Sequence, residues 1–86
     1  MFTGLLHLLL KLKDKFKNFK SIAERMSLRT EQVAMIYLLK HMDSIRNYIH
    51  TGKESSEETI MGRIQDARNY LLLLGGIIQE NNSAKR

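Results

Sequence analysis

Residues 60–78 carry more apolar side chains than a helix needs when only one of its faces is buried. Apolar residues at positions 60, 64, 67, 71, 74 and 78 recur every three or four positions, which predicts a stripe along a helix. Further apolar side chains lie beyond it, among them Met61, Leu72, Leu73 and Ile77. A helix that is apolar on nearly every side must be covered on nearly every side, by its own chain or by a second one.

Two earlier segments have the same helical spacing. The first stripe consists of Leu5, Leu8, Leu9, Leu12, Phe16, Phe19, Ala23 and Met26. The second consists of Ala34, Leu38, Met42, Ile45 and Ile49. The chain has no proline, which fits long uninterrupted helices. We therefore predict an all-α fold of three helices, at about residues 3–26, 31–51 and 56–80.

Several polar residues and one glycine mark the helix ends. Thr30 is placed to cap the second helix and Gly52 to end it. Ser55 followed by Glu58 has the spacing of a capping box, which predicts the start of the third helix. The connection between these helices is short, so the third helix should return antiparallel to the second as a hairpin. Residues 81–86 are mostly polar, which predicts a frayed tail.

The length and the cysteine count limit the class of protein. A chain of 86 residues is long enough for a single domain, residues 1–86. It contains no cysteine, which excludes a disulfide framework and a thiolate metal site. The leucine-rich start is shorter than the roughly 18 apolar residues of a membrane span and is followed by no small-residue cleavage site. We predict a cytoplasmic protein without a membrane partner.

The surplus of leucine predicts self-association. Two partner helices from the same chain leave Leu72, Leu73 and Ile77 exposed, together with Leu6 and Leu10 of the first helix. An apolar patch of this kind usually marks an interface, and two-fold pairing is its commonest form. We expect a homodimer in which two hairpins form a four-helix bundle. In the alternative, the first helix folds over the hairpin and hides these side chains.

Polar residues recur at matching levels of the predicted hairpin. The levels pair Lys40 with Asn69, Asp43 with Asp66, and Arg46 with Arg63. One interpretation is a pair of interhelical ion pairs on a solvated face, Asp43 with Arg63 and Asp66 with Arg46, which contribute little. The other is a surface that binds anions. The spacing by itself favours the ion pairs.

The anion-binding interpretation assigns a role to each polar residue. The net charge of +5 favours a negatively charged partner. Arginine and lysine would hold phosphates, Asn69 would hydrogen-bond a base or sugar, Tyr70 would stack, and Asp66 would orient an arginine. The first helix would close the site. The predicted contact residues are Lys17, Asn18, Lys40, Arg46, Arg63, Asp66, Asn69 and Tyr70.

Other kinds of site find less support. The chain contains no nucleophile paired with a base and no glycine-rich phosphate loop. His41 lies near an apolar face, which is more typical of a core residue than of a ligand, and we predict no metal site. Residues 11–20 interleave lysine with Phe16 and Phe19, but both rings lie on the core stripe. This favours a packed helix over a nucleic-acid site.

Three stretches carry a resemblance to a known group: KFKNFKSIAERMSL, QVAMIYLLKHMDSIRNYIHTGK and EETIMGRIQDARNYLLLL. They resemble small helical phage and prophage proteins of the nucleotide modification associated domain group, and distantly the MazG-like all-α nucleotide pyrophosphatases. The matching positions are Asn18, Phe19, Lys40, Gly52, Glu58, Asp66, Asn69 and Tyr70. The resemblance covers about residues 15–80 and implies a nucleotide-related role in phage biology, in the host cytoplasm.

The departure from the pyrophosphatases decides between turnover and binding. Those enzymes use carboxylates on facing helices to hold magnesium, which bridges the substrate phosphates. This chain lacks the paired Glu-x-x-Glu of the second helix and has Lys40, His41 and Arg46 there instead. We therefore predict a protein that sequesters a nucleotide or cyclic-nucleotide-type signal without a cofactor, as in phage counter-defence.

Two alternatives stay open. The first is a magnesium-dependent nucleotide pyrophosphatase that uses Glu58, Asp66 and Asp43. The second is a protein-interaction module that inhibits a host factor through the apolar patch.

Overall fold

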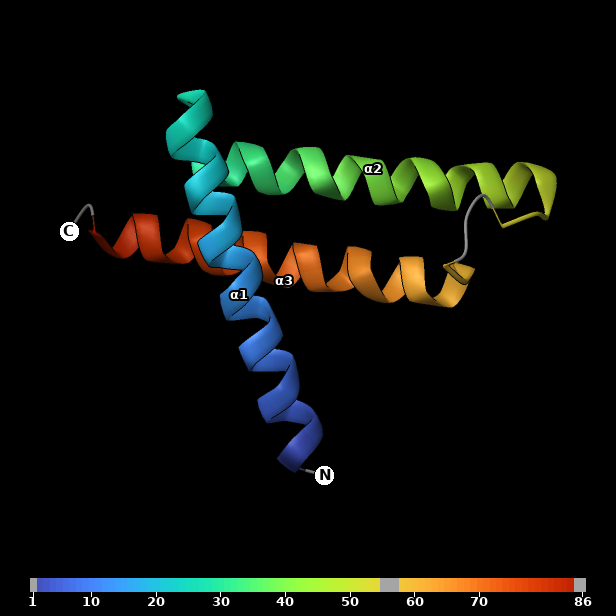
Figure 1. Ribbon diagram of the computed structural model, residues 1–86, viewed down its shortest axis with the longest axis horizontal. Helices are drawn as coiled ribbons and strands as arrows, with labels where there is room; N and C mark the ends of the chain where they lie inside the picture. The colour runs from blue at the N-terminus through green and yellow to red at the C-terminus, as the bar shows by residue number, and fades with distance from the viewer. Residues whose placement is uncertain (1, 55–57, 85–86) are drawn as a thin grey trace.

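The computed structural model consists of three α-helices joined by two connections (Figure 1). α1 is Phe2–Met26, α2 is Thr30–Thr51 and α3 is Ile60–Ala84. The structure describes the backbone of residues 2–54 and 58–84, and the side chains of residue 7 and of residues 10–54 and 58–83. These residues contain no strand, so the all-α prediction is confirmed.

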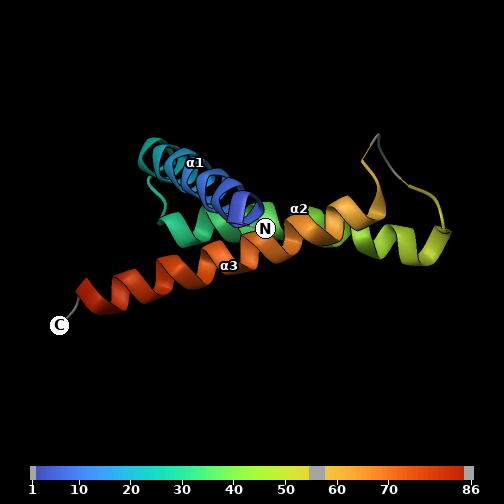
Figure 2. The ribbon, with the colours of Figure 1, turned by 90° about the horizontal axis from the view of Figure 1, so that it is seen from below.

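α2 and α3 lie side by side, and α1 packs across one side of this α2–α3 pair (Figures 1 and 2). At one end of the pair, Asn81 Nδ2 of α3 donates a hydrogen bond of 2.7 Å to Glu31 Oε2 of α2. Further along, Arg63 Nη1 lies 3.3 Å from His41 Nδ1. α1 crosses near the start of α2, and its first turns extend past α3 (Figure 1). In the part of the chain that the structure describes, no helix covers the side of the pair opposite α1.

The ends of α2 follow local hydrogen bonding. Gly52 has a left-handed backbone (φ 69°), and its N–H donates to the Tyr48 carbonyl at 2.7 Å, which confirms the predicted helix end. The predicted cap at Thr30 is wrong by one residue, because Thr30 is already helical. Gln32 Oε1 accepts the backbone N–H of Arg29 at 2.9 Å, so the first turn closes on Arg29.

α3 begins later than the sequence predicted. Ser55 lies outside the described residues, and the helix begins at Ile60 instead of residue 56. Thr59 Oγ1 accepts the N–H of Gly62 at 3.0 Å, so Thr59 caps the helix. At the other end α3 continues to Ala84, four residues beyond the predicted end at residue 80. The hydrogen bond from Asn81 to Glu31 holds the last turn of α3 against α2.

The core lies where the three helices meet. Its buried apolar residues are Phe19, Ala23, Val33, Ala34, Leu38, Ala67, Tyr70, Leu73 and Ile77. The Phe19 ring, 1% exposed, anchors α1 because it stacks on Tyr37 of α2 and Tyr70 of α3, with centroid distances of 4.9 and 5.6 Å.

The apolar stripes of α2 and α3 are only partly buried. Met42 and Ile49, predicted to lie in the core stripe of α2, are exposed, and so are Ile64, Leu71 and Ile78 of α3. Conversely, Leu73 and Ile77 were predicted to be left exposed and are buried. The physical reason is the position of α1, which covers the face beside the predicted stripe of α3. Leu10 and Leu72 are exposed as predicted, and the side chain of Leu6 lies outside the description.

Candidate functional site

Polar side chains from all three helices meet on the side of the α2–α3 pair that α1 covers. This polar cluster consists of Lys15, His41, Glu58, Arg63, Asp66 and Tyr70. His41 reaches it because it lies four residues after Tyr37, on the packed face of α2. Arg63, Asp66 and Tyr70 share one face of α3 because they are spaced by three and four residues.

An aromatic stack forms one wall of the polar cluster. The Tyr70 ring stacks on His41, with centroids 4.9 Å apart, and on Phe19. Lys15 Nζ donates to Tyr70 Oη at 3.1 Å and lies 4.6 Å from the centroid of the same ring. Three helices thus supply a stack of rings with a lysine charge at its edge, an arrangement that a cation–π contact stabilises.

Arg63 contacts two other members of the polar cluster. Its Nε lies 3.2 Å from Glu58 Oε2, and its Nη1 lies 3.3 Å from His41 Nδ1. Because a guanidinium can only donate, a hydrogen bond here requires His41 Nδ1 to accept, which places the ring proton on Nε2. The geometry therefore favours a neutral imidazole.

The charges around His41 act on its pKa in opposite directions. Burial is the largest cause and lowers the pKa below its ordinary value of 6.5. Asp66 and Glu58 raise it, whereas Arg63 and Lys15 lower it. The net lowering agrees with the contact between Arg63 and a neutral ring.

Three members of the cluster have the chemistry of metal ligands. Single ligand atoms of His41, Glu58 and Asp66 all lie within 4.8 Å of one another. Imidazole and carboxylate ligands suit a divalent ion. However, Arg63 contacts both Glu58 and His41, so a metal would have to displace a cation that is already in place. Of the predicted magnesium set, Glu58 and Asp66 come together, while Asp43 is exposed on α2 and outside this group.

Asn69 lies in the same part of α3 and is only 2% exposed. Its Oδ1 has no hydrogen-bond partner among the described residues. A buried acceptor without a donor costs about 1–3 kcal/mol. An atom of this kind can accept a hydrogen bond from a bound molecule.

The predicted contact residues divide into two groups. Arg63, Asp66 and Tyr70 belong to the polar cluster. Asn69 directly precedes Tyr70 in α3 and is buried. The other four are exposed, and among the described residues no hydrogen bond or ion pair joins their side chains to the cluster: Lys17 and Asn18 on α1, and Lys40 and Arg46 on α2. α2 turns its Tyr37–His41 face inward, which leaves Lys40, Asp43 and Arg46 outside.

The two predicted interhelical ion pairs are absent among the described residues. Arg46 and Asp66 form no ion pair among the residues that the structure describes. Arg63 pairs with Glu58, which precedes it in the sequence, instead of reaching across to the exposed Asp43.

Sequence reasoning missed Lys15 and treated His41 only as a core residue. Lys15 lies four residues before Phe19, so it shares a helix face with the residue that anchors α1. That spacing was the available signal for Lys15. His41 is indeed buried, 8% exposed, but it contacts Arg63 and Tyr70 as well as the core.

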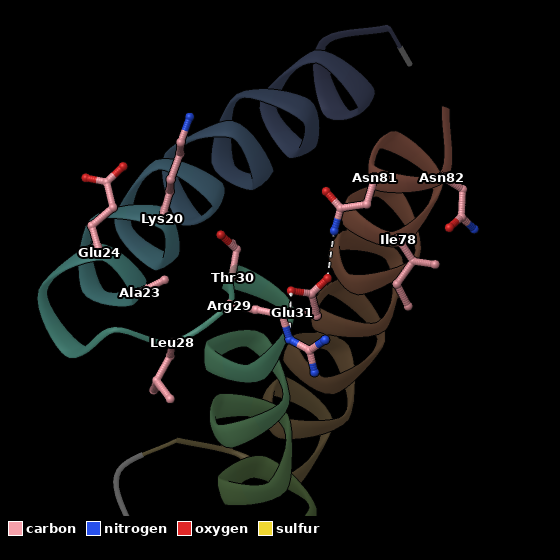
Figure 3. A pocket seen from close by; sticks show the side chains of 10 residues that line it. All are labelled: Lys20, Ala23, Glu24, Leu28, Arg29, Thr30, Glu31, Ile78, Asn81 and Asn82. Carbon is pink, nitrogen blue, oxygen red and sulfur yellow. Dashed lines mark hydrogen bonds and ion pairs between the residues drawn. The ribbon is translucent and has the colours of Figure 1, made fainter. Parts of the chain in front are cut away.

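A separate open groove of about 650 Å³ lies between the ends of α1 and α3 and the start of α2 (Figure 3). Within it, Glu31 accepts a hydrogen bond from Asn81 and lies 3.9 Å from Arg29. Lys20 and Arg29 are balanced there by Glu24 and Glu31, and the described residues that line the groove include no aromatic ring. It is therefore less suited to a phosphate-bearing ligand than the polar cluster.

Two further findings bear on the class of protein. No helix in the described part of the chain has an apolar stretch long enough to span a bilayer. Comparison with protein-family models, curated proteins and solved structures gives no match.

Proposed function

We propose that the protein binds a nucleotide or a nucleotide-derived signal at the polar cluster and does not hydrolyse it. The observation that carries this proposal is the convergence of Lys15 and Arg63, from two helices, on the stacked rings of His41 and Tyr70. Lysine and arginine hold phosphates. The two rings are buried and stacked on each other and on Phe19, so they position the cations instead of receiving a base. The cluster thus supplies recognition of the phosphate part of a nucleotide.

The surroundings of the cluster define how a ligand would be held. The free space beside Glu58 and Arg63 is only about 10 Å³, so the ligand contacts the solvent side of the cluster and does not enter the core. Lys15 is half-buried, and no carboxylate pairs with it among the described residues, so its charge is available to a phosphate.

Arg63 favours binding over cleavage. Its guanidinium occupies the space between Glu58 and His41 that a catalytic metal ion would need. A fixed cation can hold a phosphate but generates no hydroxide for attack on it. Together with the resemblance to phage proteins, this favours sequestration of a phosphate-bearing messenger in a host cell, as a counter-defence protein would act.

The proposal includes an antiparallel hairpin of α2 and α3 and a homodimer built from two such hairpins. The support for the hairpin is the contact of Asn81 with Glu31 at one end of the pair and of Arg63 with His41 further along. The support for the homodimer is the number of large apolar side chains that α1 leaves exposed on both helices.

Calorimetry with ATP, GTP, cyclic AMP and inorganic phosphate, each with magnesium and with EDTA, tests the proposal. We expect at least one nucleotide to bind equally well in both buffers. Lys15→Ala should weaken this binding at least about tenfold, the effect of losing one charge-assisted hydrogen bond. Lys40→Ala, which removes the same charge from an exposed position, should change it less than about threefold.

The other outcomes identify the alternatives. Binding that requires magnesium and releases pyrophosphate would overturn sequestration and favour the pyrophosphatase, with His41, Glu58 and Asp66 as ligands. The absence of binding to every compound would leave the protein-interaction module.

A further inference from the structure

The side of the α2–α3 pair opposite α1 carries a regular row of apolar side chains on each helix. On α2 these are Met35, Met42 and Ile49, and on α3 they are Ile64, Leu71 and Ile78. Within each helix the residues are seven positions apart, so they share one face. All six are exposed, and together they are called the apolar seam.

The residues between them complete a repeat known from helical bundles. Leu38 and Ile45 on α2, and Ala67 and Leu74 on α3, fall between the seam residues at alternating steps of three and four. These four are buried or half-buried, because they turn toward the neighbouring helix. Both helices therefore have the a and d pattern by which four-helix bundles pack, with one of its two positions left uncovered.

α1 does not cover the seam. Its Ile22 and Met26 face Val33, Ile36 and Tyr37 of α2. Its Leu12 and Phe16 face Leu72, Leu73 and Ile77 of α3. Helical spacing turns these positions away from the seam. Figure 2 shows α1 on one side of the α2–α3 pair.

We infer that the apolar seam is the homodimer interface, and that its occupant is the seam of a second copy of this chain. The inference deepens the proposed homodimer, and it replaces Leu73 and Ile77, which are buried, with a different surface. A second copy fits because both helices present the same side-chain class at the same spacing. An identical face related by a two-fold axis then sets apolar rows against apolar rows.

The extent of the seam sets the size of the interface that it can form. Each row spans 15 residues, or about 21 Å of helix, and the two helices side by side give it a width of about 20 Å. This footprint of about 420 Å² is roughly half of the 800 Å² per partner that standard interfaces bury, so the seam forms a small interface. At the rim stand exposed charged residues, Arg46 on α2 and Arg68 on α3, as expected for an interface with an apolar centre.

The seam and the polar cluster lie on opposite sides of the α2–α3 pair, so pairing leaves each cluster within one protomer. This separates the two proposals experimentally. A variant that dissociates the dimer should keep its nucleotide binding, and a variant of Lys15 should keep the dimer.

Two adjacent leucines provide a matched test. Leu71 and Leu72 are each 55% exposed, but Leu71 belongs to the seam, whereas Leu72 lines the groove against α1. Sedimentation equilibrium of the full chain should show a dimer for the wild type. Leu71→Asp should raise the dimer dissociation constant at least about 100-fold, because the seam would bury an unpaired carboxylate. Leu72→Asp should leave it within about threefold.

A second pair of variants guards against misfolding, and far-UV circular dichroism verifies the helix content of each. Met42→Asp, in the seam of α2, should dissociate the dimer, whereas Ile36→Asp, exposed on the α1 side, should not. A monomeric wild type at about 100 μM, or a dimer broken by Leu72→Asp and untouched by Leu71→Asp, would overturn the inference. ATP calorimetry on Leu71→Asp shows separately whether the polar cluster binds.

Discussion

The two sides of the α2–α3 pair differ in how their side chains are satisfied. On the side that α1 covers, polar and aromatic groups are mixed, as in the contacts of Tyr70 with Lys15, His41 and Phe19. On the opposite side, the seam is apolar at every repeat. The polar groups stand where a third helix supplies partners at hydrogen-bond distance. The apolar groups stand where none of the described helices reaches, so a second molecule is needed to remove them from water.

This difference gives each side its own vulnerability. The covered side depends on one aromatic anchor and on a balance of charges, so single substitutions there should change the stability of each protomer. The bare side contributes little to the protomer and should respond to protein concentration instead.

The largest effect is expected where α1 is anchored. Phe19→Ala should lower the free energy of unfolding by about 3–5 kcal/mol, because it opens a cavity among Tyr37 and Tyr70. Urea unfolding followed by circular dichroism measures this. Met26→Ala, exposed on the same helix, serves as the control with a change of less than about 0.5 kcal/mol. Equal effects of the two substitutions would show that α1 is not held by Phe19.

A smaller effect, of opposite sign, is expected at Asn69. Asn69→Leu removes a buried acceptor that has no donor, so it should raise the free energy of unfolding by about 1 kcal/mol. Because Asn69 is buried and the ligand contacts the solvent side of the cluster, the same substitution should leave nucleotide binding unchanged. Thermal melting and calorimetry test the two parts separately, and a loss of more than about 1 kcal/mol would contradict the assignment of an unpaired acceptor.

Two adjacent glycines compare the two sides directly. Nothing lies within 4 Å of a Cβ placed at Gly75 or Gly76, so alanine at either should stabilise α3 by up to about 1 kcal/mol. Gly76 lines the groove against α1, and its alanine should act equally at every protein concentration. Gly75 lies beside Leu71 and Ile78 of the seam. The stability gained from Gly75→Ala should therefore decrease as the protein concentration, and with it the fraction of dimer, increases. Melting temperatures measured over a range of protein concentrations test this difference. The same concentration dependence in both alanine variants would contradict it.

The pH dependence should be the smallest effect, because Asp66 and Glu58 partly offset the burial of His41. The folded pKa of His41 is lowered, so the unfolded chain binds more protons in the range between the folded pKa and 6.5. The contribution of His41 to the free energy of unfolding is fully present above pH 6.5 and is lost as the pH falls through the folded pKa. Urea midpoints between pH 7.5 and pH 5 should fall less in His41→Phe, which keeps a ring beside Tyr70. An identical fall in both proteins would exclude His41 as the cause.

The sequence determined the elements because they depend on local interactions. Apolar spacing without proline specified three helices, and the left-handed turn at Gly52 was readable because few other residues tolerate it. The start of α3 was not readable, because Thr59 and the Ser55–Glu58 spacing offer competing caps. Part of the site was also readable, since Arg63, Asp66 and Tyr70 are neighbours on one helix and need no tertiary contact to share a face.

Only the tertiary structure decided which apolar residues are covered and which polar ones meet. Helical spacing fixes the angle between side chains on one helix, but not the rotation of one helix against another. The crossing of α1 made that choice: it buried Leu73 and Ile77, left Leu71 exposed, and brought Lys15 to Tyr70 from 55 positions away in the sequence. Lys40 and Arg46 were separated from the cluster for the same reason, because α2 turns His41 inward.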